Sequence, residues 1–158
     1  MIIVYTPRGG EPERFDARLR VSETVRVAQT VDRTWPDIKG SLNDDTEAMR
    51  VVAWVVKKRD QPDLRYGDFD PFDDELTTRL DRDEVTRWAE ATAGFAWLEP
   101  NATTETVTTA LAIIPTVADD HEHAEQVVER LAAERPKDRP SPSEPTTGPS
   151  GPSGTSRR

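Results

Sequence analysis

The residues that could bind a metal are few in this sequence, and their spacing is poor for that purpose. The densest run of carboxylates covers residues 68–75. An EF-hand loop starting there would place Asp73 where glycine is needed and Arg79 where the bidentate glutamate belongs. His121 and His123 lie two apart, so on a helix they point to different faces, unlike the i, i+4 pair of zinc sites. The spacing favours a solvated acidic loop and a helix start, and we expect no metal and no cofactor.

Nucleophilic catalysis is not indicated either. The sequence has no cysteine, two histidines, no glycine-rich loop with phosphate-binding spacing, and no serine, histidine and aspartate arrangement that resembles a triad. The basic run Lys57, Lys58 and Arg59 is not interpreted as a site, because it follows an apolar segment, where cations complement the negative end of a helix dipole. We therefore expect a protein that is not an enzyme.

Composition narrows the class of protein further. With 158 residues the chain fits one domain that is long enough to bury a core. The formal net charge is −9, and residues 1–135 carry 17 Lys and Arg against 28 Asp and Glu. Because an acidic surface repels phosphate backbones, we expect no nucleic-acid binding. The sequence shows neither a signal-peptide core nor a membrane-spanning segment, which predicts a soluble protein of the cytoplasm.

The longest apolar block predicts the central helix of the fold. Residues 48–56 are apolar except for Arg50, a pattern typical of a helix that is buried on nearly every side. Asp44 and Glu47 have the three-residue spacing of an N-terminal capping pair. Beyond the basic run a proline prevents the helix from continuing. Trp54 is the largest side chain of the block, and we expect it to anchor the core.

The first 20 residues predict a β-hairpin. Residues 1–5 are β-branched and aromatic, residues 6–10 are turn formers, and residues 14–19 alternate between polar and apolar. An isolated hairpin is marginally stable in water. We therefore expect this one to lie on the helices or to pair with another chain.

Helical periodicity covers most of the chain after the hairpin. We expect helices over residues 22–32, from residue 35 onward, and over residues 73–92 and 119–134, with a break at residues 94–100; a second break near residues 81–83 stays open. For residues 103–114 the spacing favours a helix, whereas the threonines favour a strand. The residues expected on the inner face of the 73–92 helix are Leu76, Leu80, Val85, Trp88, Ala89 and Thr92. Those expected in a short extended piece within the break are Phe95, Trp97 and Leu98. The apolar residues expected to pack back onto the central helix from the connector behind it are Leu64, Tyr66, Phe69 and Phe72.

These patterns predict a mostly α fold with three parts. The first part is the N-terminal β-hairpin at residues 1–20, and the second is a small helical domain at residues 21–135. The third, residues 136–158, consists of Pro, Ser, Gly and Thr with a few charges and has no Ala, Val, Ile, Leu, Met, Phe, Trp, Tyr or Cys. Such a composition cannot bury enough surface to offset chain entropy, so we expect a disordered tail.

Eight residues in and after the central helix form a pattern that is typical of one protein family. They are Ala48, Val52, Trp54, Val55, Arg59, Pro62, Leu64 and Asp68. With the hairpin-like start, this pattern resembles the tail assembly chaperones of long-tailed, siphovirus-type phages, most closely those of phages and prophages of actinobacteria. The resemblance covers roughly the first 75 residues and is a sequence pattern, not a catalytic signature.

The resemblance implies a binding protein and not an enzyme. It implies binding to the tape-measure protein before the tail tube polymerises around it, and recruitment of tail-tube subunits. We expect the chain to act in many copies, with self-association of these copies left open. A small acidic protein that covers apolar stretches of a long helical chain would keep the complex soluble. The candidate contact surfaces are the hairpin edge and the apolar stripe of the last helix, Val127, Val128 and Leu131.

Two other classes of protein stay open at this point. One is a structural subunit of the virion, such as a head–tail connector or a minor tail protein, whose hairpin or tail would order on assembly. The other is a small acidic protein that binds and regulates a host protein. Gene context and the composition of purified virions separate these classes from a chaperone.

Overall fold

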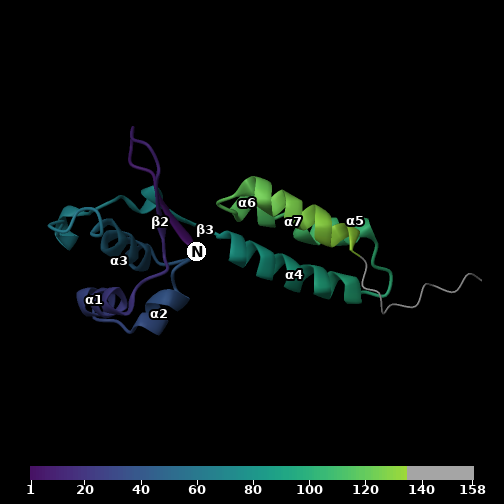
Figure 1. Ribbon diagram of the computed structural model, residues 1–158, viewed down its shortest axis with the longest axis horizontal. Helices are drawn as coiled ribbons and strands as arrows, with labels where there is room; N and C mark the ends of the chain where they lie inside the picture. Colours follow the sequence, from purple (N-terminus) through teal and green to yellow (C-terminus); the bar gives the residue numbers. More distant parts are fainter. Residues whose placement is uncertain (135–158) are drawn as a thin grey trace, which may run out of the picture.

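The computed structural model describes residues 1–134, and it is mostly helical with a small N-terminal sheet, as the sequence predicted (Figure 1). The predicted disordered tail at residues 136–158 lies outside the described residues. The strands are β1 (Ile2–Tyr5), β2 (Glu13–Asp16) and β3 (Leu76–Arg79). The helices are α1 (Val21–Val31), α2 (Trp35–Gly40), α3 (Thr46–Lys57), α4 (Arg82–Leu98), α5 (Thr104–Leu111), α6 (Ile114–Val117) and α7 (His121–Ala133), with short 3₁₀ turns at Tyr66–Asp68 and Asp73–Glu75.

The chain forms two lobes that lie side by side along the long axis (Figure 1). The N-terminal lobe, residues 1–79, contains the sheet and α1 to α3, and the helical lobe, residues 81–134, contains α4 to α7. Their buried side chains form two separate hydrophobic clusters. Residues 21–135, predicted as one helical domain, therefore contribute to two cores.

The predicted hairpin is present, and a third strand completes its sheet. The strand order is β2-β1-β3, and both pairings are antiparallel, with Ile3 opposite Phe15 on one side and opposite Thr78 on the other. Residues 76–79 were predicted to be helical because Leu76 and Leu80 have helical spacing, and that prediction was wrong. Pairing with the free edge of β1 extends this segment instead, and its adjacent threonines favour a strand.

Helix α3 lies at the centre of the N-terminal lobe, as predicted. Its buried residues are Ala48, Met49, Val51, Val52, Ala53, Trp54 and Val55. The N-cap is Asp45, one residue later than the predicted capping pair, and its carboxylate accepts hydrogen bonds from the backbone N–H groups of Glu47 and Ala48. The same carboxylate pairs with Arg33 in the loop before α2, so the start of α3 is tied to the preceding helices.

The connector after α3 folds back over the helix, as predicted for most of its apolar residues. The Trp54 indole donates a hydrogen bond to the Leu64 carbonyl at 3.1 Å, and its ring meets the Tyr66 ring edge-on at 5.3 Å between centroids. Phe69 is buried. Phe72 is the exception, since its side chain is 58% exposed, and the prediction for this residue was wrong.

The three cations after α3 do more than complement the helix dipole. Lys57 pairs with Glu13 on β2, and Lys58 donates to the carbonyls of Pro62 and Leu64 in the connector. The Arg59 guanidinium donates to both carboxylate oxygens of Glu23, each at 2.8 Å. Glu23 is buried in the first turn of α1, so this ion pair joins the end of α3 to the start of α1.

In the helical lobe, α4 continues without interruption to Leu98. The prediction of a break at Gly94 and of an extended piece for Phe95, Trp97 and Leu98 was therefore wrong. Gly94 is exposed within the helix, where a single glycine costs about 1 kcal/mol, less than the packing of the helix provides. Trp97 is buried and donates to the Leu131 carbonyl of α7. The predicted helices at residues 103–114 and 119–134 are present as α5 and α7.

Replacement of Trp54 by alanine is expected to lower the free energy of unfolding by about 3–5 kcal/mol, because a large side chain leaves the core. Trp54→Phe should lose roughly 1–2 kcal/mol, since the ring stays but the hydrogen bond to Leu64 is lost. Urea unfolding measures both values. Trp88→Ala is the matched control, because this tryptophan is 41% exposed. Equal losses for Trp54→Ala and Trp88→Ala would contradict the assignment of the core.

The Glu23–Arg59 pair predicts a pH-dependent contribution to stability. Hydrogen bonds from Arg59 and from the Arg20 backbone N–H lower the pKa of Glu23 from 4.5 to about 2 in spite of burial. Because the folded pKa lies below the unfolded pKa, the contribution is complete above the unfolded pKa and is lost as the pH falls towards 2. Glu23→Gln should therefore lose about 2–3 kcal/mol at pH 7, a value that allows for the partial exposure of Arg59.

Urea unfolding of the wild type and Glu23→Gln at pH 7, 4 and 2.5 tests this contribution. The difference between the two proteins should narrow as the pH falls. A difference that stays constant over this range would show that the ion pair does not carry the effect.

Candidate functional site

The outer face of α4 carries large apolar side chains that the fold leaves exposed. Trp88, Phe95 and Leu98 are 41%, 74% and 77% exposed, and Ala91 between them is exposed as well. The four residues follow each other at intervals of three, four and three, the spacing of an a/d seam on a helix. We call Trp88, Ala91, Phe95 and Leu98 the α4 seam.

The α4 seam lies opposite the face of α4 that packs into the helical lobe. The inward face consists of Val85, Ala89, Ala93 and Trp97, which pack with residues of α5 and α7. At about 100° per residue, these side chains and the α4 seam point to opposite sides of the helix. Figure 1 shows the same arrangement, with α5, α6 and α7 together on one side of α4.

Trp88 was predicted on the inner face and lies on the outer one. The i, i+3, i+4 template accepts both Trp88 and Ala89 after Val85, so periodicity alone does not separate them. The structure places the small side chain inward, where α7 approaches α4 closely. The spacing of Trp88, Phe95 and Leu98 was a signal for this surface in the sequence, but the predicted break at Gly94 hid it.

The helical lobe that carries the α4 seam is strongly acidic. Residues 81–134 contain three arginines and twelve Asp and Glu, a net charge of −9, and residues 1–79 contain 13 Lys and Arg against 16 Asp and Glu, a net charge of −3. One of the three arginines, Arg82, is paired with Asp120 at 2.6 Å. Glu90 on α4 and Glu99 at its C-cap are exposed. The apolar α4 seam therefore belongs to a lobe with a large excess of negative charge.

The predicted contact surface on α7 is largely used within the lobe. Val127 is 5% exposed, and Val128 and Leu131 are half-buried against the core formed with α4 and α5. The stripe was identified correctly as one apolar face of a helix. The apolar atoms of Val127 are covered by this chain, whereas Val128 and Leu131 stay partly exposed, so contact of this stripe with a partner stays a prediction.

Six of the eight residues of the family pattern hold the N-terminal lobe together, and the eight do not form a surface cluster. Ala48, Val52, Trp54 and Val55 are buried in α3. Of the remaining four, Arg59 pairs with Glu23, Leu64 is half-buried against the core, and Pro62 and Asp68 are exposed. The pattern thus corresponds to the core of the N-terminal lobe and its closing ion pair.

The candidate metal-binding residues have structural partners. His121 lies 3.0 Å from the Pro115 carbonyl and 3.2 Å from Glu125, and His123 lies 3.5 Å from the Thr86 hydroxyl. In the acidic stretch the Glu75 carboxylate accepts backbone N–H groups of the same lobe. Within residues 1–134 no group of three or more His, Asp or Glu is placed to hold a metal ion.

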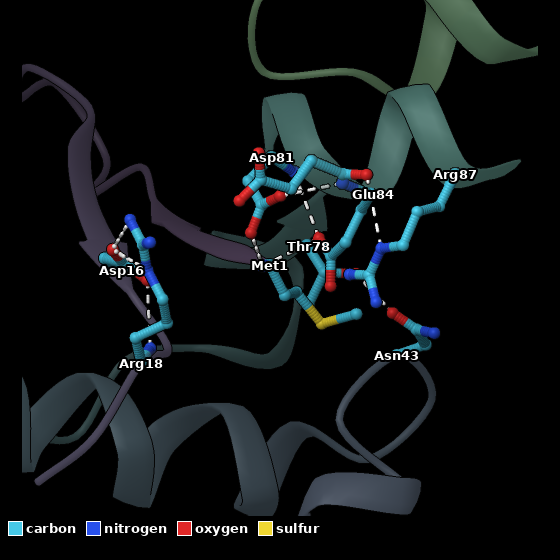
Figure 2. A network of polar contacts seen from close by, with 9 residues as sticks. Met1, Asp16, Arg18, Asn43, Thr78, Asp81, Glu84 and Arg87 are labelled. Atoms are coloured by element: carbon cyan, nitrogen blue, oxygen red, sulfur yellow. Dashed lines mark hydrogen bonds and ion pairs between the residues drawn. The ribbon is translucent and has the colours of Figure 1, made fainter. Parts of the chain in front are cut away.

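Charged groups gather where the two lobes meet (Figure 2). The Met1 ammonium lies 2.5 Å from Asp81 and 2.7 Å from Glu84, both at the start of α4. Burial by itself raises the pKa of Asp81, but hydrogen bonds from the Met1 ammonium and the Glu84 backbone N–H bring this pKa below its ordinary value. A cleft of about 400 Å³ opens beside these groups, lined by Trp35, Arg87 and their neighbours. The charged groups beside this cleft position α4, and among its lining residues no nucleophile is paired with a base.

Further contacts fix the end of the sheet to the helical lobe. Leu80, which directly follows β3, donates to the Val117 carbonyl and accepts from the Asp119 backbone N–H, so both hydrogen bonds join it to the segment between α6 and α7. Arg14 of β2 pairs with Asp119 at 2.8 Å. The contacts around the first turn of α4 leave the more distal part of its outer face uncovered.

No family model, curated protein or solved structure matches this chain. Among the helices of residues 1–134, none combines the length and apolar character needed to cross a bilayer.

Replacement of Asp81 by asparagine is expected to lower the free energy of unfolding by about 1–2 kcal/mol. The change weakens the cap on the Glu84 backbone N–H and removes the ion pair with Met1. Thermal and urea unfolding measure the loss. Glu90→Gln, a neutralisation on the exposed surface of the same helix, should be nearly neutral. If both variants lose the same stability, the Met1–Asp81 contact does not join the lobes as described.

Proposed function

We propose that this protein is a non-enzymatic tail assembly chaperone of a long-tailed phage or prophage of actinobacteria, acting in the host cytoplasm. In this role it binds the tape-measure protein in many copies and helps to recruit tail-tube subunits. The resemblance of residues 48–68 to that family suggests the class of protein. The single observation that supports a binding role most strongly is the exposed α4 seam on an acidic lobe.

The size of the α4 seam fits a binding surface. From the exposed fractions of Trp88, Phe95 and Leu98, its apolar area is on the order of 300–400 Å², within the range of the largest apolar patches on monomeric proteins. Patches of this size on monomeric proteins are often functional. The three large side chains also lie in one row on one helix, which is the arrangement used when one helix packs on another.

The charge of the helical lobe supports a chaperone in particular. A long helical chain with apolar stretches tends to self-associate, and a bound protein with a net charge of −9 on one lobe would add mutual repulsion between the complexes. The contact would thus be apolar while the outside of the complex stays acidic. Neither the apolar contact nor the acidic exterior of the complex requires a catalytic group.

Co-expression tests this function. The chain is expressed with the tape-measure protein encoded beside it, and the expected result is that the tape-measure protein becomes soluble and co-purifies with the chain. The tape-measure protein alone, and with an unrelated acidic protein of similar size, serves as the control. Equal solubility in all three expressions would contradict the proposal.

Purified virions provide the second half of the test. A chaperone is absent from the mature particle, so mass spectrometry of virions should not find this chain. Its presence in stoichiometric amounts would instead identify a structural subunit of the tail or connector. Binding to a host protein without binding to the tape-measure protein would identify a regulatory protein.

A further inference from the structure

We infer that the α4 seam is the docking site for a single cationic amphipathic helix of a partner protein. The inference deepens the proposed function, because it rests on that function for the source of the helix and adds the surface and the chemistry of the segment that binds.

The geometry of the α4 seam fits a helix as the occupant. From Trp88 to Leu98 the row extends over about 15 Å of α4, or roughly three helical turns. Side chains at three- and four-residue intervals pack against the same intervals on a second helix. A partner helix with apolar residues at i, i+3 or i+4 and i+7 would cover this length.

The charge of the lobe fits a cationic helix. The helical lobe has a net charge of −9, and exposed carboxylates lie close to the row in the sequence, Glu90 on α4 and Glu99 at its C-cap. Beyond its first residue α4 carries a single cation, Arg87. Lysines or arginines that border the apolar face of a partner helix would therefore meet a negative potential, which raises both specificity and association rate.

A second copy of this chain fits the surface less well. The α4 seam offers on the order of 300–400 Å² of apolar area, whereas a stable dimer buries about 800 Å² from each partner. Two helical lobes with a net charge of −9 each would also repel one another. Residues 136–158 of the same chain contain prolines but no Ala, Val, Leu, Ile, Met, Phe, Trp or Tyr, so this segment lacks the row of apolar side chains that a helix packed against Phe95 and Leu98 needs.

The test uses a synthetic peptide as the probe. The probe is an 18-residue fluorescein-labelled peptide of leucine and lysine in which the leucines form one helical face. Two control peptides are the same sequence with glutamate for lysine, and the leucine–lysine composition in an order that breaks the apolar face. Fluorescence anisotropy with the full chain measures the affinity, and circular dichroism and thermal unfolding confirm that each protein variant is folded.

Two protein variants carry the comparison. Phe95→Glu combined with Leu98→Glu changes the α4 seam, and because both side chains are exposed, the fold should be retained. Val21→Glu combined with Val25→Glu on α1 is the matched control, since these valines are 82% and 50% exposed and lie in the other lobe. Both variants add the same negative charge, which by itself favours a cationic peptide. A loss of binding in the first variant alone therefore reports the apolar contact.

The expected result is that the leucine–lysine peptide binds the wild type and the α1 variant with equal affinity and binds the α4 variant at least tenfold more weakly. The glutamate peptide and the reordered peptide should not bind. Equal affinity of the α4 variant, or equal binding of the glutamate peptide, would overturn the inference. A wild-type dimer in sedimentation that the α4 variant converts to a monomer would overturn it in favour of a second copy.

The same variants separate this inference from the proposed function. If the peptide binds as expected but the tape-measure protein does not, the helix site stands and the chaperone function fails. If the tape-measure protein binds the α4 variant as tightly as the wild type, the chaperone function stands and the α4 seam is not its contact.

Discussion

The burial of α3 is the constraint on which the N-terminal lobe depends. A helix with buried side chains on nearly every face must be covered from several directions at once. The sheet packs on one side of α3, α1 packs on another, and the connector after α3 returns along a third. The ion pairs at its two ends, Asp45 with Arg33 and Arg59 with Glu23, join α3 to the helices and loops that cover it. Without this cover the apolar block would be exposed to water.

The strand β1 connects this core to the second lobe. It is the central strand of the sheet, so its two neighbours, β2 and β3, are held by the same residues. Strand β3 leads directly to Leu80 and the start of α4, where the Met1 ammonium meets Asp81 and Glu84. The first turn of α4 is thus fixed to the sheet, and the rest of the helix extends away from it with α5 and α7 on one side (Figure 1).

Elements that follow from local pattern were predictable from the sequence, and elements that depend on distant partners were not. The α3 block is a continuous apolar run with a cap at each end, and the hairpin and the α7 stripe each have a clear period, so the existence of all three could be predicted. Strand β3 could not, because the spacing of Leu76 and Leu80 matches a helix and the pairing that decides its structure is with β1, more than 70 residues away. The outer face of α4 was missed for a related reason. A helix with apolar residues on two faces has no single period, and Gly94 suggested an end that packing overrides.

The distribution of side-chain sizes around α4 indicates which property of this helix is under selection. Three of the residues on or beside its inner face, Ala89, Ala93 and Ala96, are small, and the large Phe95 and Leu98 lie outside. If folding were the sole requirement, moving the large side chains inward would bury more apolar area, and each fully buried large side chain contributes roughly 1.5–3 kcal/mol. The alanines instead let α5 and α7 approach α4 closely, and they leave the outer face to side chains that contribute little to the stability of the isolated chain. An arrangement that gives up this stability is expected where the outer face has a binding role of its own.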